Sequence, residues 1–260
     1  MRSSISTARS PWIQGALEPV LPSLALMTCV WLLLLVPALL PEALRPPAVL
    51  AAYAVALAVI LALAPRRRRS EAAGASPLSL VGLGLAAGLL SYPAWISISL
   101  LLGLSLGLPG GSPTPPWPGA PWTWSIALLL APALEELLYR DRVLPVLSEH
   151  WGATAGIVVT SACFALPHLE PWAVLVCFEL GLVAGVLRLA ARSVAPCIGL
   201  HAGLNLASLA FGVPGFELHP LGPATGALLG SAALLGAVCL ARRPLRLRTS
   251  ARTAIRTSPR

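Results

Sequence analysis

Two adjacent carboxylates and a guanidinium lie within one apolar stretch, Ala-Leu-Glu-Glu-Leu-Leu-Tyr-Arg at 133–140. A carboxylate near the middle of a bilayer-spanning helix costs about 3 kcal/mol even on lenient insertion scales, so an intramembrane acidic pair is a functional hypothesis by default. Because residues four apart share a helix face, Glu136 can pair with Arg140. This pairing would hold Glu136 ionised as a structural partner and leave Glu135 free to act as a base.

Two further short patterns carry the remaining chemistry. Phe164 and His168 are four residues apart, as are His201 and Asn205, so each pair shares a helix face. An imidazole can move a proton, and an Asn amide can donate to a developing oxyanion. Each residue alone is explained by an interhelical hydrogen bond, but one hydrolytic site explains all of them together.

The composition places these residues in a membrane protein. Of 260 residues, 57% are hydrophobic and 11% are charged, against about 25% charged in soluble domains. All basic residues are arginines, and they cluster at the ends of apolar runs. This distribution follows the positive-inside rule and excludes a nucleic-acid partner, which would need basic residues interleaved with aromatics.

Apolar runs of membrane-spanning length recur along the chain. They predict eight spans, at 20–40, 47–64, 78–108, 122–140, 153–168, 171–187, 193–211 and 221–240. We therefore expect an all-α, polytopic transmembrane bundle with both termini cytoplasmic, because this places the four arginines at 66–69 inside. Arg140 and Arg142 end the fourth span and are expected at or near the inner surface.

The third run, 78–108, is long for one span and is expected to form one tilted or broken helix kinked at Pro93. The proline-rich segment 109–121 that follows is expected on the non-cytoplasmic side. Three glycines of this run are expected at close helix contacts: Gly82, Gly84 and Gly88.

The chain divides into a short polar tail at 1–19, a single transmembrane domain at 20–241 and an Arg-rich cytoplasmic tail at 242–260. The catalytic core is expected at 120–211, because all the polar residues described above fall there. A multi-pass protein of the bacterial inner membrane is the expected localisation.

The three patterns together resemble a known family. E-E-x-x-x-R, F-x-x-x-H and H-x-x-x-N begin at Glu135, Phe164 and His201, in the order found in the CPBP family of intramembrane endopeptidases. That family includes the CAAX prenyl endopeptidases and bacteriocin-processing enzymes. Each motif alone is weak, but three in order on successive apolar spans are specific, and the resemblance covers 120–211.

The resemblance implies a role for each motif residue. Glu135 and His168 would activate a water molecule, and His201 with Asn205 would stabilise the oxyanion. The supporting residues are Glu136, Arg140 and Phe164.

The resemblance leaves the cofactor open, because members have also been described as metalloproteases. Glu135, His168 and His201 would offer zinc or another divalent metal three protein ligands and an open position. A metal-free mechanism is preferred, because the sequence has no H-E-x-x-H helix and these residues lie on three separate spans.

One geometric condition must hold for a common site. Counted from the span ends, His168 lies toward the outer end of its helix and His201 nearer the inner end, about 10 Å apart in depth at 1.5 Å per residue. Pro167 and Pro196 are candidates for the kinks that would remove this difference.

The expected partners are the lipid bilayer and a peptide or protein substrate cut near its C-terminus or lipid anchor. A lipidated C-terminal motif, a bacteriocin precursor and a C-terminal sorting tail all remain open as substrates. A non-enzymatic scaffold or immunity-type protein, with the Glu and His cluster as interhelical contacts, is the alternative. A proton-coupled transporter is disfavoured, because no internal repeat is evident.

Overall fold

The computed structural model describes residues 20–63, 76–108 and 124–211, and within these ranges the chain forms helices and no strands. The prediction of an all-α fold is confirmed for this part of the chain. The helices and short helical segments are α2 (Leu21–Leu35), η1 (Val36–Leu39), η2 (Glu42–Leu44), α3 (Arg45–Ala62), α4 (Pro77–Ser105), η3 (Ile126–Leu130), α6 (Ala131–Glu136), η4 (Leu137–Val143), α7 (Leu144–Trp151), α8 (Ala153–Ala165), η5 (Leu166–His168), α9 (Pro171–Ala191) and α10 (Ala195–Phe211).

Four of these helical stretches are long and apolar enough to cross a bilayer: Leu21–Leu39, Glu42–Ala62, Pro77–Ser105 and Pro171–Ala191. Two shorter apolar helices, Ala153–His168 and Ala195–Ala210, pack among them. The chain is thus an integral membrane protein with several spanning helices. The eighth predicted span, 221–240, and both terminal tails lie outside the described residues, so the count of eight and the orientation stay predictions.

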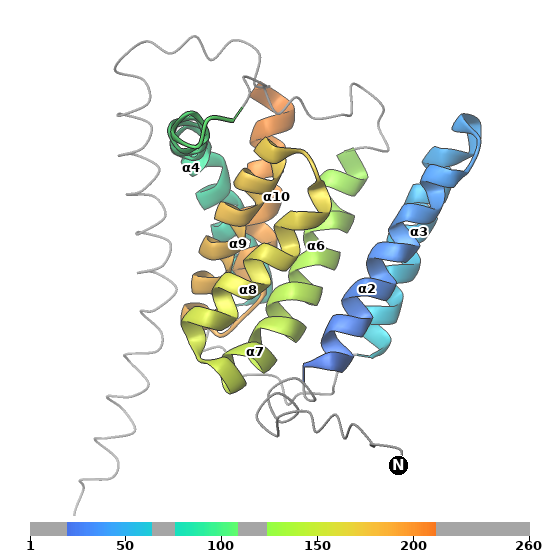
Figure 1. The fold of residues 1–260 in the computed structure, drawn as a ribbon, viewed down its shortest axis with the longest axis horizontal. Helices are drawn as coiled ribbons and strands as arrows, with labels where there is room; N and C mark the ends of the chain where they lie inside the picture. Colours follow the sequence, from blue (N-terminus) through green and yellow to red (C-terminus); the bar gives the residue numbers. More distant parts are fainter. Residues whose placement is uncertain (1–19, 64–75, 109–123, 212–260) are drawn as a thin grey trace, which may run out of the picture.

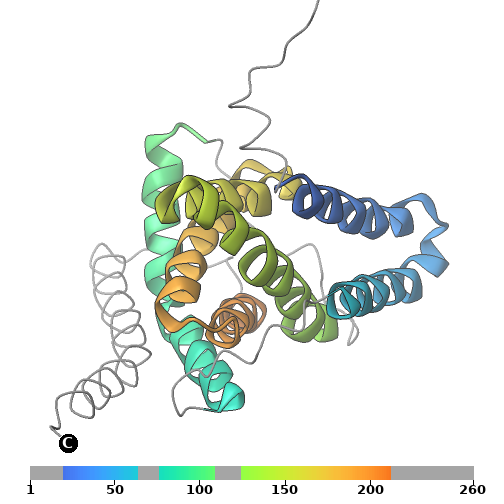
Figure 2. The same ribbon diagram turned by 90° about the horizontal axis from the view of Figure 1, so that it is seen from below.

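The helices are unevenly associated. α2 and α3 lie side by side at one edge of the molecule, next to α6, and α4 lies on the opposite side of the bundle (Figure 1; Figure 2). Few residues of α2 and α3 are buried within the protein, as expected for helices that face lipid. α6 to α10 and α4 form the packed bundle that holds the three motifs.

The fourth predicted span differs from expectation. Residues 124–151 are helical without a break, and the helix widens into π-helix at η3 and η4, on both sides of the acidic pair. Arg140 therefore lies inside the helix and is fully buried among protein side chains. Its expected position at or near the inner membrane surface stays a prediction. Arg142 is likewise within the helix and donates to the Ile60 carbonyl at the end of α3. A partner carboxylate and two aromatic rings, described below, compensate the buried charge of Arg140.

The third predicted span is a single helix, α4, with Pro93 inside it. α4 crosses α10 with the two backbones in contact. A Cβ added at Gly84 would lie 2.2 Å from the Pro196 carbonyl oxygen, and one added at Gly203 would lie 2.3 Å from the Leu85 carbonyl oxygen. This is the small-residue packing that membrane helices use in place of a hydrophobic driving force.

Four glycines make this crossing, two from each helix at four-residue spacing: Gly84, Gly88, Gly199 and Gly203. Two of the three glycines predicted on α4 are thus confirmed. The prediction that Gly82 lies at a close helix contact is wrong, because a Cβ there would meet no atom within 4 Å. It lies on a different face of α4, which shows that spacing alone did not identify the packed face.

Candidate active site

The two carboxylates project from α6 into the protein. Glu135 is 6% exposed and Glu136 is 0% exposed. Consecutive helical residues point about 100° apart, so the two side chains meet different neighbours. Two π-helical segments flank this six-residue helix. Such widened turns are frequent at functional sites, because they re-aim side chains locally.

Glu136 is held by charge from two sides. Its Oε2 lies 3.2 Å from Nε of Arg140, and its Oε1 lies 3.1 Å from Nδ1 of His201 on α10. The predicted pairing of Glu136 with Arg140 is confirmed. An ionised carboxylate can only accept, so Nδ1 of His201 carries the proton in this contact.

Arg140 is the largest fully buried side chain among the described residues. Its guanidinium carbon lies 4.6 Å from the ring centre of Phe164, which is a cation–π contact. Within the described part of the chain, its Nη1 and Nη2 have no hydrogen-bond partner. The Glu136 charge, the Phe164 ring and the Tyr139 ring, whose centre lies 5.8 Å away, compensate its burial.

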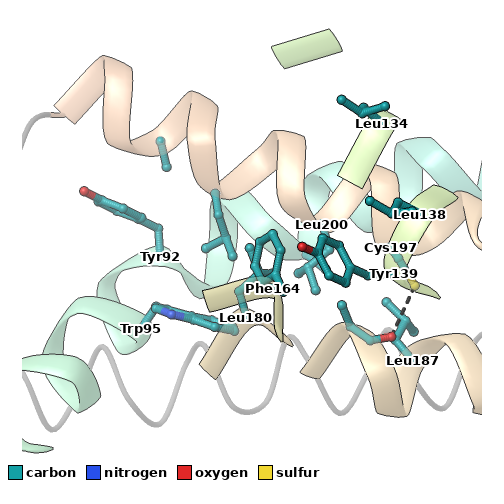
Figure 3. Packing of buried hydrophobic residues seen from close by; sticks show 14 of the residues in the cluster. Tyr92, Trp95, Leu134, Leu138, Tyr139, Phe164, Leu180, Leu187, Cys197 and Leu200 are labelled. Atoms are coloured by element: carbon teal, nitrogen blue, oxygen red, sulfur yellow. Dashed lines mark hydrogen bonds between the residues drawn. The ribbon is translucent and has the colours of Figure 1, made fainter. Parts of the chain in front are cut away.

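Phe164, at the end of α8, is the hub of an aromatic cluster. Its ring centre lies 5.6 Å from that of His168, 5.8 Å from that of His201 and 5.4 Å from that of Tyr139, each in edge-to-face geometry. Figure 3 shows Phe164 beside Tyr139 and Leu200 in the core. Both motif imidazoles thus pack against the ring of Phe164.

Glu135 faces the same cluster. Its Oε2 lies 3.9 Å from Nε2 of His201, and its carboxylate interacts electrostatically with both His201 and His168. Tyr53 of α3 also lies within electrostatic reach of Glu135. Glu135 therefore lies close to His201 and within electrostatic reach of His168, while the catalytic roles of the three residues stay predictions.

The backbone around His168 explains how it reaches the cluster. α8 tightens into the 3₁₀ turn η5, which contains Pro167, and Leu169 then adopts φ 61° and ψ −36°. A leucine in this region is strained, and such strain is typical of turns that the surrounding structure fixes. Nδ1 of His168 bonds the Ala165 carbonyl oxygen at 3.2 Å, so the neutral ring keeps its lone pair on Nε2.

Asn205 lies one helical turn beyond His201 on α10. Its Nδ2 donates to the Ala127 carbonyl oxygen in η3 at 2.8 Å. This bond fixes the amide against the π-helical turn and uses one of its two hydrogens. Among the described residues, no hydrogen bond joins the Asn205 amide to Glu135, His168 or His201.

Sequence reasoning missed two neighbours of the site. Trp31 of α2 donates through Nε1 to the Tyr139 hydroxyl at 2.5 Å, and its ring centre lies 6.2 Å from that of His168. Tyr139 donates in turn to the Cys163 carbonyl oxygen at 3.2 Å. Tyr139 occupies a variable position of its motif, so the motif gave no signal. Trp31 lies far away in sequence within an apolar span, so no pattern could have found it.

The alternative metal ligands do not converge as a metal site. Among the residues that the structure describes, no three His, Cys, Asp or Glu side chains are grouped so as to hold a metal ion. Nδ1 of His168 bonds the Ala165 carbonyl oxygen and Nδ1 of His201 bonds Glu136, so Nε2 of each ring is the atom left to act as a ligand. The metal-free mechanism stays a prediction.

Comparison with known proteins gives one family. Residues 117–207 match the family described as Type II CAAX prenyl endopeptidase Rce1-like. No curated protein and no solved structure matched. The matched segment contains all three motifs and the helices that carry them, from Glu135 to Asn205. The predicted resemblance to CPBP-family endopeptidases is thereby confirmed over residues 117–207, where this membrane protein is similar to the type II CAAX prenyl endopeptidase Rce1-like family.

Proposed function

We propose that this protein is an intramembrane endopeptidase that hydrolyses a peptide bond of a membrane-associated substrate near its C-terminus or lipid anchor. The observation that carries the proposal is the buried carboxylate of Glu135, 3.9 Å from one motif imidazole and in electrostatic contact with the other. A carboxylate so placed inside a membrane bundle has a large solvation cost, which a catalytic role explains. Similarity to a protease family over the same residues supports this reading.

Glu135 and His168 together act as the general base that activates a water molecule. The lone pair on Nε2 of His168 and the Glu135 carboxylate are the two acceptors available to take the proton. The oxygen of the activated water adds to the carbonyl carbon of the substrate. The proton then passes to the leaving nitrogen as the carbon–nitrogen bond breaks, so that a carboxylic acid and an amine result.

His201 and Asn205 stabilise the oxyanion. Glu136 supports a protonated His201 ring through Nδ1, which leaves a second proton on Nε2 to donate. The hydrogen of the Asn205 amide that does not bond Ala127 is the second donor. Removing one such donor costs about 100- to 1000-fold in kcat in comparable hydrolases.

The proposal is tested first on the substrate. Protein C-termini are compared by mass spectrometry in cells that carry the chain, lack it, or carry Glu135→Ala. New C-termini that appear only with the unmodified chain are expected, and they identify the substrate together with the activity. An identical set of C-termini in all three strains would refute the proposal.

The scaffold alternative is supported by one observation. Glu136, Arg140 and His201 form interhelical and intrahelical polar contacts that need no catalysis. The variant His168→Ala distinguishes the two functions, because His168 lies outside that ionic network. If the protein is an enzyme, His168→Ala should keep the expression and melting temperature of the unmodified chain and lose its turnover. If the protein is a scaffold, neither the unmodified chain nor the variant should cleave a substrate.

The absence of a metal requirement is part of the proposal and has its own test. Purified protein is dialysed against a series of chelators, and cleavage of a substrate found as above is followed. Unchanged cleavage is expected. Loss of cleavage that zinc or another divalent metal restores would show that the alternative ligand set operates.

A further inference from the structure

The N-terminal hairpin contributes a side chain to the site although it lies outside the matched segment 117–207. α2 and α3 stand at the edge of the bundle (Figure 1), and few of their residues are buried within the protein. On α2, Leu32 is 60% exposed while its neighbour Trp31 turns inward and is half-buried. Trp31 is therefore one of the side chains through which this hairpin contacts the catalytic helices.

The hydrogen bonds of Trp31 have fixed directions. The indole N–H can only donate, so the Tyr139 hydroxyl accepts from it, and this hydroxyl then donates to the Cys163 carbonyl oxygen. Tyr139 is fully buried. The relay ties α2 to the helix of the acidic pair and to α8 one turn before His168, and it fixes the plane of the indole ring.

The indole ring then meets His168 itself. The two ring centres are 6.2 Å apart with an interplanar angle of 73°, and Phe164 makes a similar contact with His168 at 5.6 Å and 70°. The imidazole is half-buried, and its Nδ1 donates a hydrogen bond to the Ala165 carbonyl oxygen. Its orientation thus depends on one backbone bond and two aromatic edges.

We infer that Trp31 is a positioning residue that holds the His168 imidazole, so that the N-terminal hairpin completes a site which residues 117–207 alone leave open. This inference rests on the proposed function only for its kinetic consequence. A misplacement of about 1 Å caused by a residue remote from the chemistry can cost about 100-fold in rate. Because Trp31 contacts the base and not the bond that breaks, its loss should lower kcat and leave KM unchanged.

The kinetic test uses three variants of the full-length protein. Trp31→Ala removes both the ring contact and the hydrogen bond and should lower kcat about 100-fold. Trp31→Phe keeps an aromatic edge against His168 without the N–H, so its kcat should fall between that of Trp31→Ala and the unmodified chain. Leu32→Ala, on the exposed face of the same helix turn, is the matched control and should cleave at the unmodified rate.

The second readout does not depend on cleavage. The chain has four histidines, so ¹⁵N-histidine labelling gives few resonances, and His168→Gln assigns that of His168. The unmodified chain should show His168 as one tautomer with the proton on Nδ1. Trp31→Ala should produce a tautomer mixture, whereas Leu32→Ala should leave the resonance unchanged.

The outcomes separate the inference from the proposed function. An unchanged His168 resonance in Trp31→Ala overturns the inference, as does a fall in kcat that a lower melting temperature accounts for. If the unmodified chain cleaves no substrate, the proposed function fails, while the His168 resonance still decides whether Trp31 orients the ring.

Discussion

Glu135 and Glu136 are neighbours in the chain with different surroundings. Glu136 lies between a guanidinium and an imidazole, and its neighbour faces His201 across a longer gap of 3.9 Å. A carboxylate that accepts from both a guanidinium and an imidazole N–H is suited to a structural role, whereas Glu135 is less tightly held. The two residues should therefore respond differently to the same substitution.

We expect Glu136→Gln to destabilise the fold and Glu135→Gln to leave it intact. The first change leaves the fully buried Arg140 charge without its partner, which costs about 3–5 kcal/mol in proteins. The second removes a proposed base, which is worth about 100- to 10,000-fold in rate. Thermal unfolding in detergent and cleavage of the identified substrate measure the two effects. Equal melting temperatures for the two variants would contradict the assignment of roles.

A double variant separates stability from activity at the same residues. In Glu136→Gln/Arg140→Met no buried charge is left unpaired, and replacing a buried ion pair by apolar groups is often neutral. We expect the melting temperature to recover relative to Glu136→Gln alone. Cleavage should stay lost, because His201 no longer faces a carboxylate at Nδ1. Recovery of both would mean that Glu136 serves stability alone.

At the scale of elements, the crossing of α4 and α10 determines where His201 and Asn205 lie. Gly199 precedes His201 by two residues, and a Cβ there would lie 2.0 Å from the Val81 carbonyl oxygen. Because backbone atoms fill the contact, no rotamer change can make room for a larger residue. The position of α10 is therefore fixed by α4, a helix outside the matched segment.

We expect Gly199→Ala to lower stability by about 1–3 kcal/mol, as overpacking does elsewhere. It should also reduce cleavage, because α10 must move away from α4 and carry its two site residues with it. Gly82→Ala is the matched control on the same crossing helix, where a methyl group meets no atom within 4 Å. Its melting temperature should stay the same or rise, since Ala exceeds Gly in helix propensity by about 1 kcal/mol. The opposite order of melting temperatures would contradict the packing described.

The sequence predicted where these helices lie along the chain better than it predicted the geometry within each helix. Apolar length located the helices, and the four-residue spacing correctly paired Glu136 with Arg140 and Phe164 with His168. The π-helical turns could not be predicted, because they depend on contacts made elsewhere, such as the bond from Asn205 to Ala127. The burial of Arg140 was missed for the same reason, since its compensating ring comes from another helix.

At the scale of the whole molecule, the orientation in the membrane remains a prediction from charge. The arginines at 66–69 should lie in the cytoplasm and the segment 109–121 on the opposite side, because arginine-rich loops are retained inside. Single cysteines introduced into each segment of a cysteine-free variant, probed with a membrane-impermeant reagent on intact cells, test this. Labelling at 109–121 alone is expected. Labelling at 66–69 alone would invert the topology.

The backbone contact between α4 and α10 also limits how such proteins can diverge or be recombined. Where side chains separate two helices, a substitution can be accommodated by a rotamer change in a neighbouring residue. At the glycine contact between α4 and α10 the nearest atoms are backbone atoms, so no rotamer change can make room for a larger residue. A chimera that receives α10 from a related enzyme should fold only when α4 is transplanted with it. The unit that must be inherited together then includes α4, which lies outside the stretch of chain in which the three motifs occur.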